Sequence, residues 1–453
     1  MNPIISFGYL FCLICIYTVS DFQTLLSCTV IIFTGNIVSY LVLRGKAQKL
    51  YRVFLLLLLL YVTACYIYMK LNGYSFLLAF DTINVFIPTT ENYLAGNSIN
   101  EAIKDIWQDY NVLNRLQVGF YTFLVLIGGG ARFFDADIYL SLQIGLITLC
   151  ASIPVLIYYI FSRILDLSEH KSETYALSIS VFSSIFFYSA NILRDGMIAV
   201  LIVYTIYLML KHYSNRNLAA IILNIFIIST LRIETGLMMI SFIPFYFYII
   251  KKDHSYTFIS IIVAFSLLCF ALQIIGENIN GITQVFDDNR AYYVEGIENQ
   301  TGIIGALQKL PFGISHFLSI IYTMLNPVPF WMKMDVTYNA ELPECYNIML
   351  FPTGISAFFN TFIIVIFVMQ AVFHTKIKQN TKKLKIILIP VLISLFLQAA
   401  VVEQRRVIGL YAIIYIFAFL YYVNMNSQQR NHILMLSTVA FLFINIIGLI
   451  IIS

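Results

Sequence analysis

The sequence predicts an all-α protein, a polytopic bundle of helices embedded in a membrane. Hydrophobic residues make up 60% of the chain and charged residues only 11%, whereas a soluble domain has about 25% charged residues. The mean hydropathy is +0.85. Long apolar runs, such as 3–19 and 138–161, match the length that a helix needs to cross a hydrocarbon core of about 30 Å. These runs are continuous and do not alternate with polar residues, which favours helices over barrel strands.

The apolar runs predict about 13 transmembrane helices in one domain that covers residues 1–453. In chain order they occupy 3–19, 23–43, 53–71, 138–161, 176–193, 196–210, 218–231, 236–250, 256–275, 353–373, 384–400, 407–424 and 433–452.

Basic residues in the short loops predict the orientation of these spans. One set of loops holds 16 basic residues, namely Arg44, Lys46, Lys49, Arg52, Arg163, Lys171, Lys211, Arg216, Lys251, Lys252, Lys376, Lys378, Lys382, Lys383, Lys385 and Arg430. The same loops hold four acids, Asp166, Glu169, Glu173 and Asp253. Loops rich in lysine and arginine face the cytoplasm. We therefore expect the N-terminus inside and the C-terminus outside.

Two further apolar segments, 117–130 and 313–330, are not counted as spans. Counting either one would invert every basic loop that follows it. We therefore expect both to be juxtamembrane or re-entrant helices on the outer side. That side then carries two large segments, 72–137 and 276–352.

Three short charged turns lie between long apolar runs on this predicted outer side. They are Arg194-Asp195, Arg232-Ile233-Glu234 and Glu403-Gln404-Arg405-Arg406. Arginine is costly at a bilayer boundary and usually faces a cavity or a partner there. Several guanidinium groups at one membrane face favour an anion such as a phosphate or diphosphate.

A simpler interpretation of the arginines remains open. Each could extend along the membrane interface, or pair with the acid beside it. In that case Arg194 would pair with Asp195, and Arg232 with Glu234.

Two stretches of the chain resemble enzymes that use polyprenyl-linked sugars. Residues 78–211 look like the N-terminal half of GT-C-type glycosyltransferases, because Asp81 follows a span, an amphipathic and an apolar juxtamembrane segment come next, and Arg194-Asp195 follows. The segments LPFGISHFLSIIYTMLNPVPFW and EQRRVIGLYAIIYIFAF are similar to polytopic proteins of bacterial surface-polysaccharide clusters. The O-antigen repeat-unit polymerases, called Wzy, are the best-known members of that group.

The resemblance implies a polymerase in the bacterial inner membrane with its active site facing the periplasm. It would transfer a growing glycan from undecaprenyl diphosphate to a lipid-linked repeat unit. Its partners would be that oligosaccharide, the lipid bilayer and a chain-length regulator protein, with no nucleic acid and no cofactor. The substrate diphosphates would bind Arg194, Arg232, Arg405 and Arg406.

The acceptor hydroxyl needs a carboxylate that takes its proton as it attacks the anomeric carbon. Asp81 is the first candidate in this role, and the others are Asp195, Glu234 and Glu403. Asp81 could instead be an ordinary helix N-cap. The spacing of the acids demands no metal, although carboxylates suit hard divalent cations.

Aromatic residues of the second outer segment are candidates for stacking on sugar rings. They are Tyr292, Tyr293 and Trp331. Aromatic residues also form interfacial belts, so a purely structural role stays open for them. His316, on the apolar helix of the same segment, is expected to be structural.

Two other functions remain compatible with the sequence. One is a GT-C transferase that adds a single sugar from a polyprenyl-phosphate donor. The other is a flippase or transporter of lipid-linked oligosaccharides, which would be expected to show two related halves and charges near the bilayer midplane.

Overall fold

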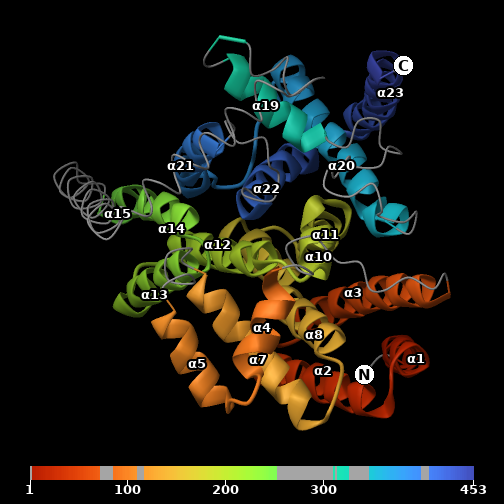
Figure 1. Cartoon of the computed structure of the whole chain (residues 1–453). Helices are drawn as coiled ribbons and strands as arrows, with labels where there is room; N and C mark the ends of the chain where they lie inside the picture. Colours follow the sequence, from red (N-terminus) through yellow and green to blue (C-terminus); the bar gives the residue numbers. More distant parts are fainter. Residues whose placement is uncertain are drawn as a thin grey trace.

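The computed structural model describes residues 3–71, 85–109, 117–251, 310–311, 314–325, 346–398 and 408–452 (Figure 1). Every element in these ranges is a helix, and none of the described residues forms a strand. The all-α prediction is therefore confirmed for this part of the chain.

The N-terminal third contains three long helices and several shorter ones. These are α1 (Pro3–Val19), α2 (Phe22–Val42), α3 (Lys46–Leu71), α4 (Ile87–Leu94), α5 (Ile99–Gln108), α7 (Val118–Phe133), α8 (Ile138–Cys150), α9 (Ile153–Tyr159) and a π-helix, η2 (Ile160–Ile164). Helix α1 packs against α3, and α2 packs against α8. Asp21 and Asp137 cap α2 and α8, because the carboxylate of each accepts a hydrogen bond from a backbone N–H of the first turn.

The remaining helices form a central group and a C-terminal group. The central group is α10 (Glu169–Phe182), α11 (Ser184–Ala190), α12 (Arg194–Leu210), α13 (Asn215–Leu231), α14 (Ile233–Ile240) and α15 (Phe242–Lys251). The C-terminal group is α19 (Ile314–Leu325), α20 (Tyr346–Phe373), α21 (Lys382–Gln398), α22 (Ile408–Asn424) and α23 (Ser427–Ile452). Figure 1 shows α19 to α23 at one end of the molecule and α1 to α8 at the other, with α10 to α14 between them.

Helix α12 is the centre of the bundle. It contacts α8, α9, α11, α13 and α22, and most of its side chains are buried. Glycine lets α22 approach it closely, since a Cβ at Gly409 would lie 3.0 Å from the Cβ of Ile202 and 3.1 Å from the Cα of Ala199. Helix α12 therefore joins the two ends of the molecule.

Five helical segments of the described chain are long and apolar enough to cross a membrane. They are Phe22–Val42, Lys46–Leu71, Ile138–Ile164, Phe351–Phe373 and Ser427–Leu449. Shorter apolar helices include α1, α13 and α22. A helical membrane protein follows from this, whereas the full count of 13 spans stays a prediction. The predicted span 256–275 lies outside the described residues.

Three of the predicted spans are broken helices, and one of them, 138–161, divides into α8 and α9 at residues 151–152. The run 176–193 divides into α10 and α11 at Ser183, whose Oγ accepts a hydrogen bond from the N–H of Ile185 at 3.3 Å and so starts a new helix. The run 236–250 divides into α14 and α15 at Ser241. Continuous hydropathy does not reveal such breaks, because a hydroxyl can replace a backbone partner without adding a charge.

Helix α7 lies across the ends of other helices. Near its start, a Cβ at Gly119 would meet the side chain of Thr230, in the last turn of α13. Further along, a Cβ at Gly128 would lie 3.5 Å from Ile138, the first residue of α8. The helix thus connects the C-terminal end of α13 with α8 from its first residue to its middle, where a Cβ at Gly145 would lie 3.1 Å from Ile127.

Helix α19 is held at its C-terminal end by a buried polar network. The amide of Asn360 in α20 donates to the carbonyl of Met324 at 2.7 Å and accepts from the hydroxyl of Tyr415 at 2.8 Å. The hydroxyls of Thr323 and Tyr411 lie 3.2 Å apart. His316 stacks on Phe396, and the structural role expected of it stays a prediction.

The outer faces of the peripheral helices are apolar. Phe7 of α1, Phe33 of α2 and Phe443 of α23 are 69%, 64% and 62% exposed. Soluble monomers rarely expose large contiguous apolar surfaces. These faces therefore suit contact with lipid.

Candidate functional site

Two of the three predicted charged turns meet in the folded chain. Helix α12 begins at Arg194, and α13 ends at Leu231, directly before Arg232. The Nη1 atom of Arg194 donates to the carbonyl oxygen of Leu231 at 3.2 Å. This hydrogen bond ties the start of α12 to the end of α13.

A buried ion pair joins the same two turns. Nη2 of Arg232 lies 2.8 Å from Oδ1 of Asp195, and the two residues are only 5% and 1% exposed. The pairing of Arg232 with its neighbour Glu234, one of the simpler interpretations, is wrong for this site. Glu234 is exposed in the first turn of α14. Asp195 does not pair with its neighbour Arg194 either, because its carboxylate faces Arg232.

Arg232 is not saturated by this pair. Its Nη1 atom is buried and has no hydrogen-bond partner among the described residues. A guanidinium carries five N–H donors in a planar fork, and an unmet donor in a buried place costs free energy. The remaining donors suit an anionic oxygen.

Helix ends add to the positive character of the site. Helix α12 starts at Arg194, and α14 starts directly after Arg232. A helix N-terminus presents unsatisfied N–H groups and a partial positive charge. The carboxylate of Asp195 in the first turn of α12 offsets part of this charge.

Two glycines allow close backbone contacts beside the charged turns. A Cβ at Gly196 would lie 2.8 Å from the carbonyl oxygen of Tyr188 and 2.9 Å from Sγ of Cys150. A Cβ at Gly236 would lie 2.7 Å from the Cα of Ser229. Each glycine follows a charged turn by one or two residues, and each permits a backbone approach that a side chain would prevent.

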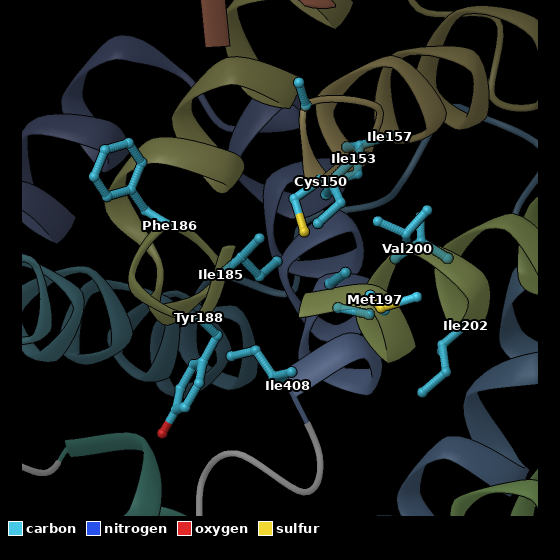
Figure 2. Close-up of a cluster of buried hydrophobic side chains, with 14 of the residues drawn as sticks. Cys150, Ile153, Ile157, Ile185, Phe186, Tyr188, Met197, Val200, Ile202 and Ile408 are labelled. Atoms are coloured by element: carbon cyan, nitrogen blue, oxygen red, sulfur yellow. The ribbon is translucent and has the colours of Figure 1, made fainter. Parts of the chain in front are cut away.

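An apolar cluster packs against the start of α12. Figure 2 shows Met197 and Val200 of α12 packed among Cys150, Ile185 and Ile408. Ile408 is the first residue of α22 and follows the segment 401–407. The cluster therefore brings the start of α22 beside the start of α12.

A buried hydrogen-bond chain positions the turn before Arg194, and sequence reasoning missed it. The hydroxyl of Tyr66 donates to Oε1 of Gln143 at 2.9 Å, and Nε2 of Gln143 donates to the carbonyl oxygen of Ala190 at 2.6 Å. Ala190 is the last residue of α11. A glutamine in the middle of an apolar run was the available signal, because a buried amide needs partners.

Several predicted site residues lie outside the described residues. They are Asp81, Glu403, Arg405, Arg406, Tyr292, Tyr293 and Trp331. The roles predicted for them stay predictions. In the parts of the chain that the structure describes, no group of three or more histidine, cysteine, aspartate and glutamate residues could hold a metal ion.

Comparisons with known proteins add no family to this picture. No family model matches the chain, and neither the curated proteins nor the solved structures include a match.

Proposed function

We propose that this chain is a surface-polysaccharide polymerase of the Wzy type, which transfers a growing glycan from undecaprenyl diphosphate to a lipid-linked repeat unit. The observation that carries the proposal is the meeting of Arg194, Asp195 and Arg232 at the starts of α12 and α14. Two arginines beside two helix N-termini suit the diphosphate that leaves as the glycosidic bond breaks.

In this mechanism a hydroxyl oxygen of the acceptor unit attacks the anomeric carbon of the lipid-linked chain. The bond from that carbon to the diphosphate oxygen breaks, and the electron pair goes to the diphosphate. A carboxylate takes the hydroxyl proton, with Asp81 as the candidate, and Glu234 and Glu403 as the alternatives. Arg194 and Arg232 stabilise the charge that develops on the leaving group.

Asp195 has a different role in the proposal from the one expected of it first. Its carboxylate is buried and faces the guanidinium of Arg232 at 2.8 Å. We assign Asp195 to hold Arg232 in place instead.

The contacts between helix ends support the predicted topology, on which the proposed periplasmic site rests. At the ends predicted to face outward, the N–H of Asp137 donates to Oγ1 of Thr24 at 2.8 Å, and Arg194 contacts Leu231. At the ends predicted to face inward, Nζ of Lys383 donates to the carbonyl of Leu210 at 3.2 Å. Each of these contacts joins two ends of the same predicted side.

The positions of α7 and α19 support the same topology. Helix α7 touches the last turn of α13 and the first residue of α8, both of which are predicted to face outward. Helix α19 contacts Tyr411, near the start of α22, and Phe396, near the end of α21. These contacts suit two juxtamembrane helices on the outer side.

The test is the lipopolysaccharide banding pattern of a strain that lacks the gene. We expect a core-plus-one-unit band in the deletion strain, with the ladder restored by the wild-type chain and not by Arg194→Ala at equal protein level. Arg163→Ala is the matched control, because Arg163 belongs to a loop predicted to face the opposite side and covers the ring of Tyr159 at 4.0 Å. A full ladder with Arg194→Ala would contradict the proposal.

A single-sugar GT-C transferase is the second candidate. The observation that favours it is the pair of short helices α4 and α5, packed against α7 directly after the segment that contains Asp81. It predicts that deletion leaves the ladder and shifts every band. Loss of the single-unit band as well would indicate the flippase or an earlier step.

A further inference from the structure

A groove lies between α3 and α10, and none of the residues that line it belongs to the charged turns of the proposed site. Its volume is about 570 Å³. At one end it is lined by Lys46, Lys49 and Glu173, and further along by Leu57, Leu177, Val181 and Phe182. The groove is therefore charged at one end and mostly apolar along its length.

The two helices start at the charged end and contact each other. Lys46 is the first residue of α3, and Glu173 lies in the first turns of α10. From Lys46 to Leu57 the helix rises by roughly 16 Å, at 1.5 Å per residue. About 6 Å of this rise, from residue 53 to Leu57, lies inside the predicted span 53–71, so the groove enters the part of one leaflet next to the headgroups.

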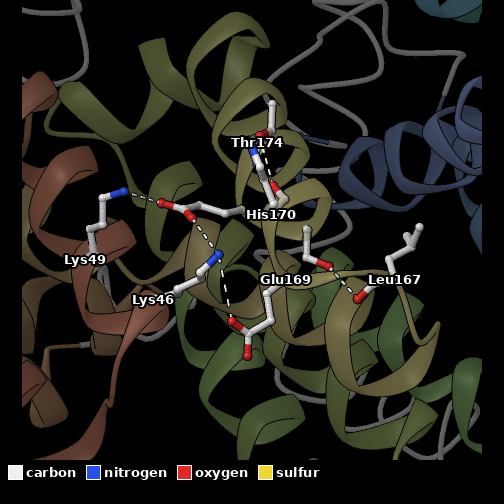
Figure 3. A network of polar contacts seen from close by, with 8 residues as sticks. Lys46, Lys49, Leu167, Glu169, His170 and Thr174 are labelled. Atoms are coloured by element: carbon white, nitrogen blue, oxygen red, sulfur yellow. Dashed lines mark hydrogen bonds and ion pairs between the residues drawn. The ribbon is translucent and has the colours of Figure 1, made fainter.

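The charged end holds a small network of two lysines and two glutamates (Figure 3). Nζ of Lys49 lies 2.6 Å from the carboxylate of Glu173, and Nζ of Lys46 lies 3.4 Å from it and 3.8 Å from that of Glu169. The charges of this network balance, and Glu169 is its one member that does not line the groove. Each ammonium group has three donors, so the two lysines keep donors beyond their ion pairs.

We infer that this groove binds one anionic phospholipid of the bilayer, with its phosphate at Lys46 and Lys49 and an acyl chain along Leu57, Leu177 and Phe182. The lysine donors that remain beyond the ion pairs select the headgroup, and the apolar lining of the groove fits the part of an acyl chain next to the headgroup. Basic clusters at the cytoplasmic ends of helices attract anionic lipids, and this end belongs to the loops predicted to face the cytoplasm.

Glu173 sets the strength of this site. Its carboxylate contacts both lysines and competes with a lipid phosphate for them. Removing that carboxylate charge frees lysine donors and removes a repulsion. If the ion pairs only held the two helices together, removing either the lysines or Glu173 would reduce lipid binding.

Native mass spectrometry of the full-length protein tests the inference with two lipids that share acyl chains, phosphatidylglycerol and phosphatidylcholine. The wild-type chain should retain phosphatidylglycerol at least fivefold over phosphatidylcholine. Lys46→Gln/Lys49→Gln should reduce the ratio to about one, and Glu173→Gln should raise it at least twofold. The matched control Lys376→Gln/Lys378→Gln removes the same charge from the same predicted side and should keep the wild-type ratio.

Several results would overturn the inference. They are equal retention of the two lipids by the wild-type chain, a ratio that falls in Glu173→Gln, and an equal fall in the control. A polyprenyl phosphate retained more tightly than phosphatidylglycerol would assign the groove to another lipid.

If the double lysine variant does not fold, Leu177→Trp provides a second test. Its fluorescence should be quenched by brominated phosphatidylglycerol at lower mole fractions than by brominated phosphatidylcholine, and equal quenching contradicts the proposal.

Discussion

Two ion-pair clusters of this protein use similar groups in opposite environments. At the start of α12, Asp195 and Arg232 pair with side-chain exposures of 1% and 6%. At the start of α3, Lys49 pairs with Glu173 at exposures of 57% and 18%. The buried pair must compensate for the lost hydration of both ions, whereas in the second pair Lys49 keeps much of its hydration, so that pair gains less from pairing. Burial, more than the distance between the charged atoms, should therefore decide what each pair contributes to the free energy of unfolding.

The largest expected effect is the loss of one partner of the buried pair. Asp195→Ala should lower the free energy of unfolding by about 3–5 kcal/mol, because it leaves the guanidinium of Arg232 buried and uncompensated. Unfolding of the purified protein in detergent, followed by thermal or denaturant titration, measures this loss. The double variant Asp195→Ala/Arg232→Met should be more stable than Asp195→Ala alone. A loss below 1 kcal/mol in the single variant would show that water reaches the pair.

A second, smaller effect is expected at Gly196, beside the buried pair. Gly196→Ala should destabilise the protein by about 1–3 kcal/mol, because its Cβ would lie 2.8 Å from the backbone oxygen of Tyr188 and one helix must shift. Gly130→Ala is the matched control, since a Cβ there meets nothing within 4 Å. The same unfolding measurement applies, and equal stability of the two variants would show that α11 and α12 separate without cost.

The exposed pair should show a smaller effect again. Lys49→Ala should change the free energy of unfolding by less than about 1 kcal/mol. Raising the salt concentration should reduce the difference between Lys49→Ala and the wild type, because exposed charges are screened. The difference between Asp195→Ala and the wild type should persist under the same conditions. Equal salt dependence at the two sites would show that burial does not protect the Asp195–Arg232 pair from screening.

The smallest effect is a pH dependence carried by Glu173. Partial burial raises the pKa of its carboxyl, but hydrogen bonds and charge from Lys49 and Lys46 outweigh burial and hold the pKa below its ordinary value. A lowered pKa in the folded state stabilises the protein above the unfolded pKa, near 4.3, and this contribution disappears as the pH falls through the folded pKa.

Titration of stability from pH 7 to pH 3 measures this contribution. The groups that face Glu173 are Lys46 and Lys49 of α3, with Glu169 and His170 on its own helix. The wild-type chain should lose slightly more stability than Glu173→Gln over this range. If Glu173→Gln loses as much as the wild type, the pairing with lysine carries no pH dependence.

Much of the fold and part of the site could be predicted from residues read in order. The boundaries of α1, α2 and α13 follow from their apolar runs, to within three residues of the prediction. The convergence of Arg194 and Arg232 followed from counting spans and loop charges. The breaks at Ser183 and Ser241 did not follow, since a serine that caps a helix and a serine inside one look alike in a hydropathy profile.

The site also shows where prediction from neighbours in the sequence fails. Arg194-Asp195 and Arg232-Ile233-Glu234 each offer an acid close to an arginine, yet Arg232 pairs with Asp195 across two helices. Adjacent positions at the start of a helix point in different directions, so proximity along the chain does not ensure contact. Gln143 and Tyr66 became part of the site only through long-range packing.

By itself, the sequence determined the helical class, the membrane environment and the placement of arginine at short turns between apolar runs. These features depend on local composition and on the requirement that backbone groups be hydrogen-bonded in lipid. The tertiary structure alone decided which charges meet, which helix lies across others and which groove opens beside the lysines. Those outcomes depend on residues distant in sequence, because side-chain packing and desolvation are set by all the neighbours in space.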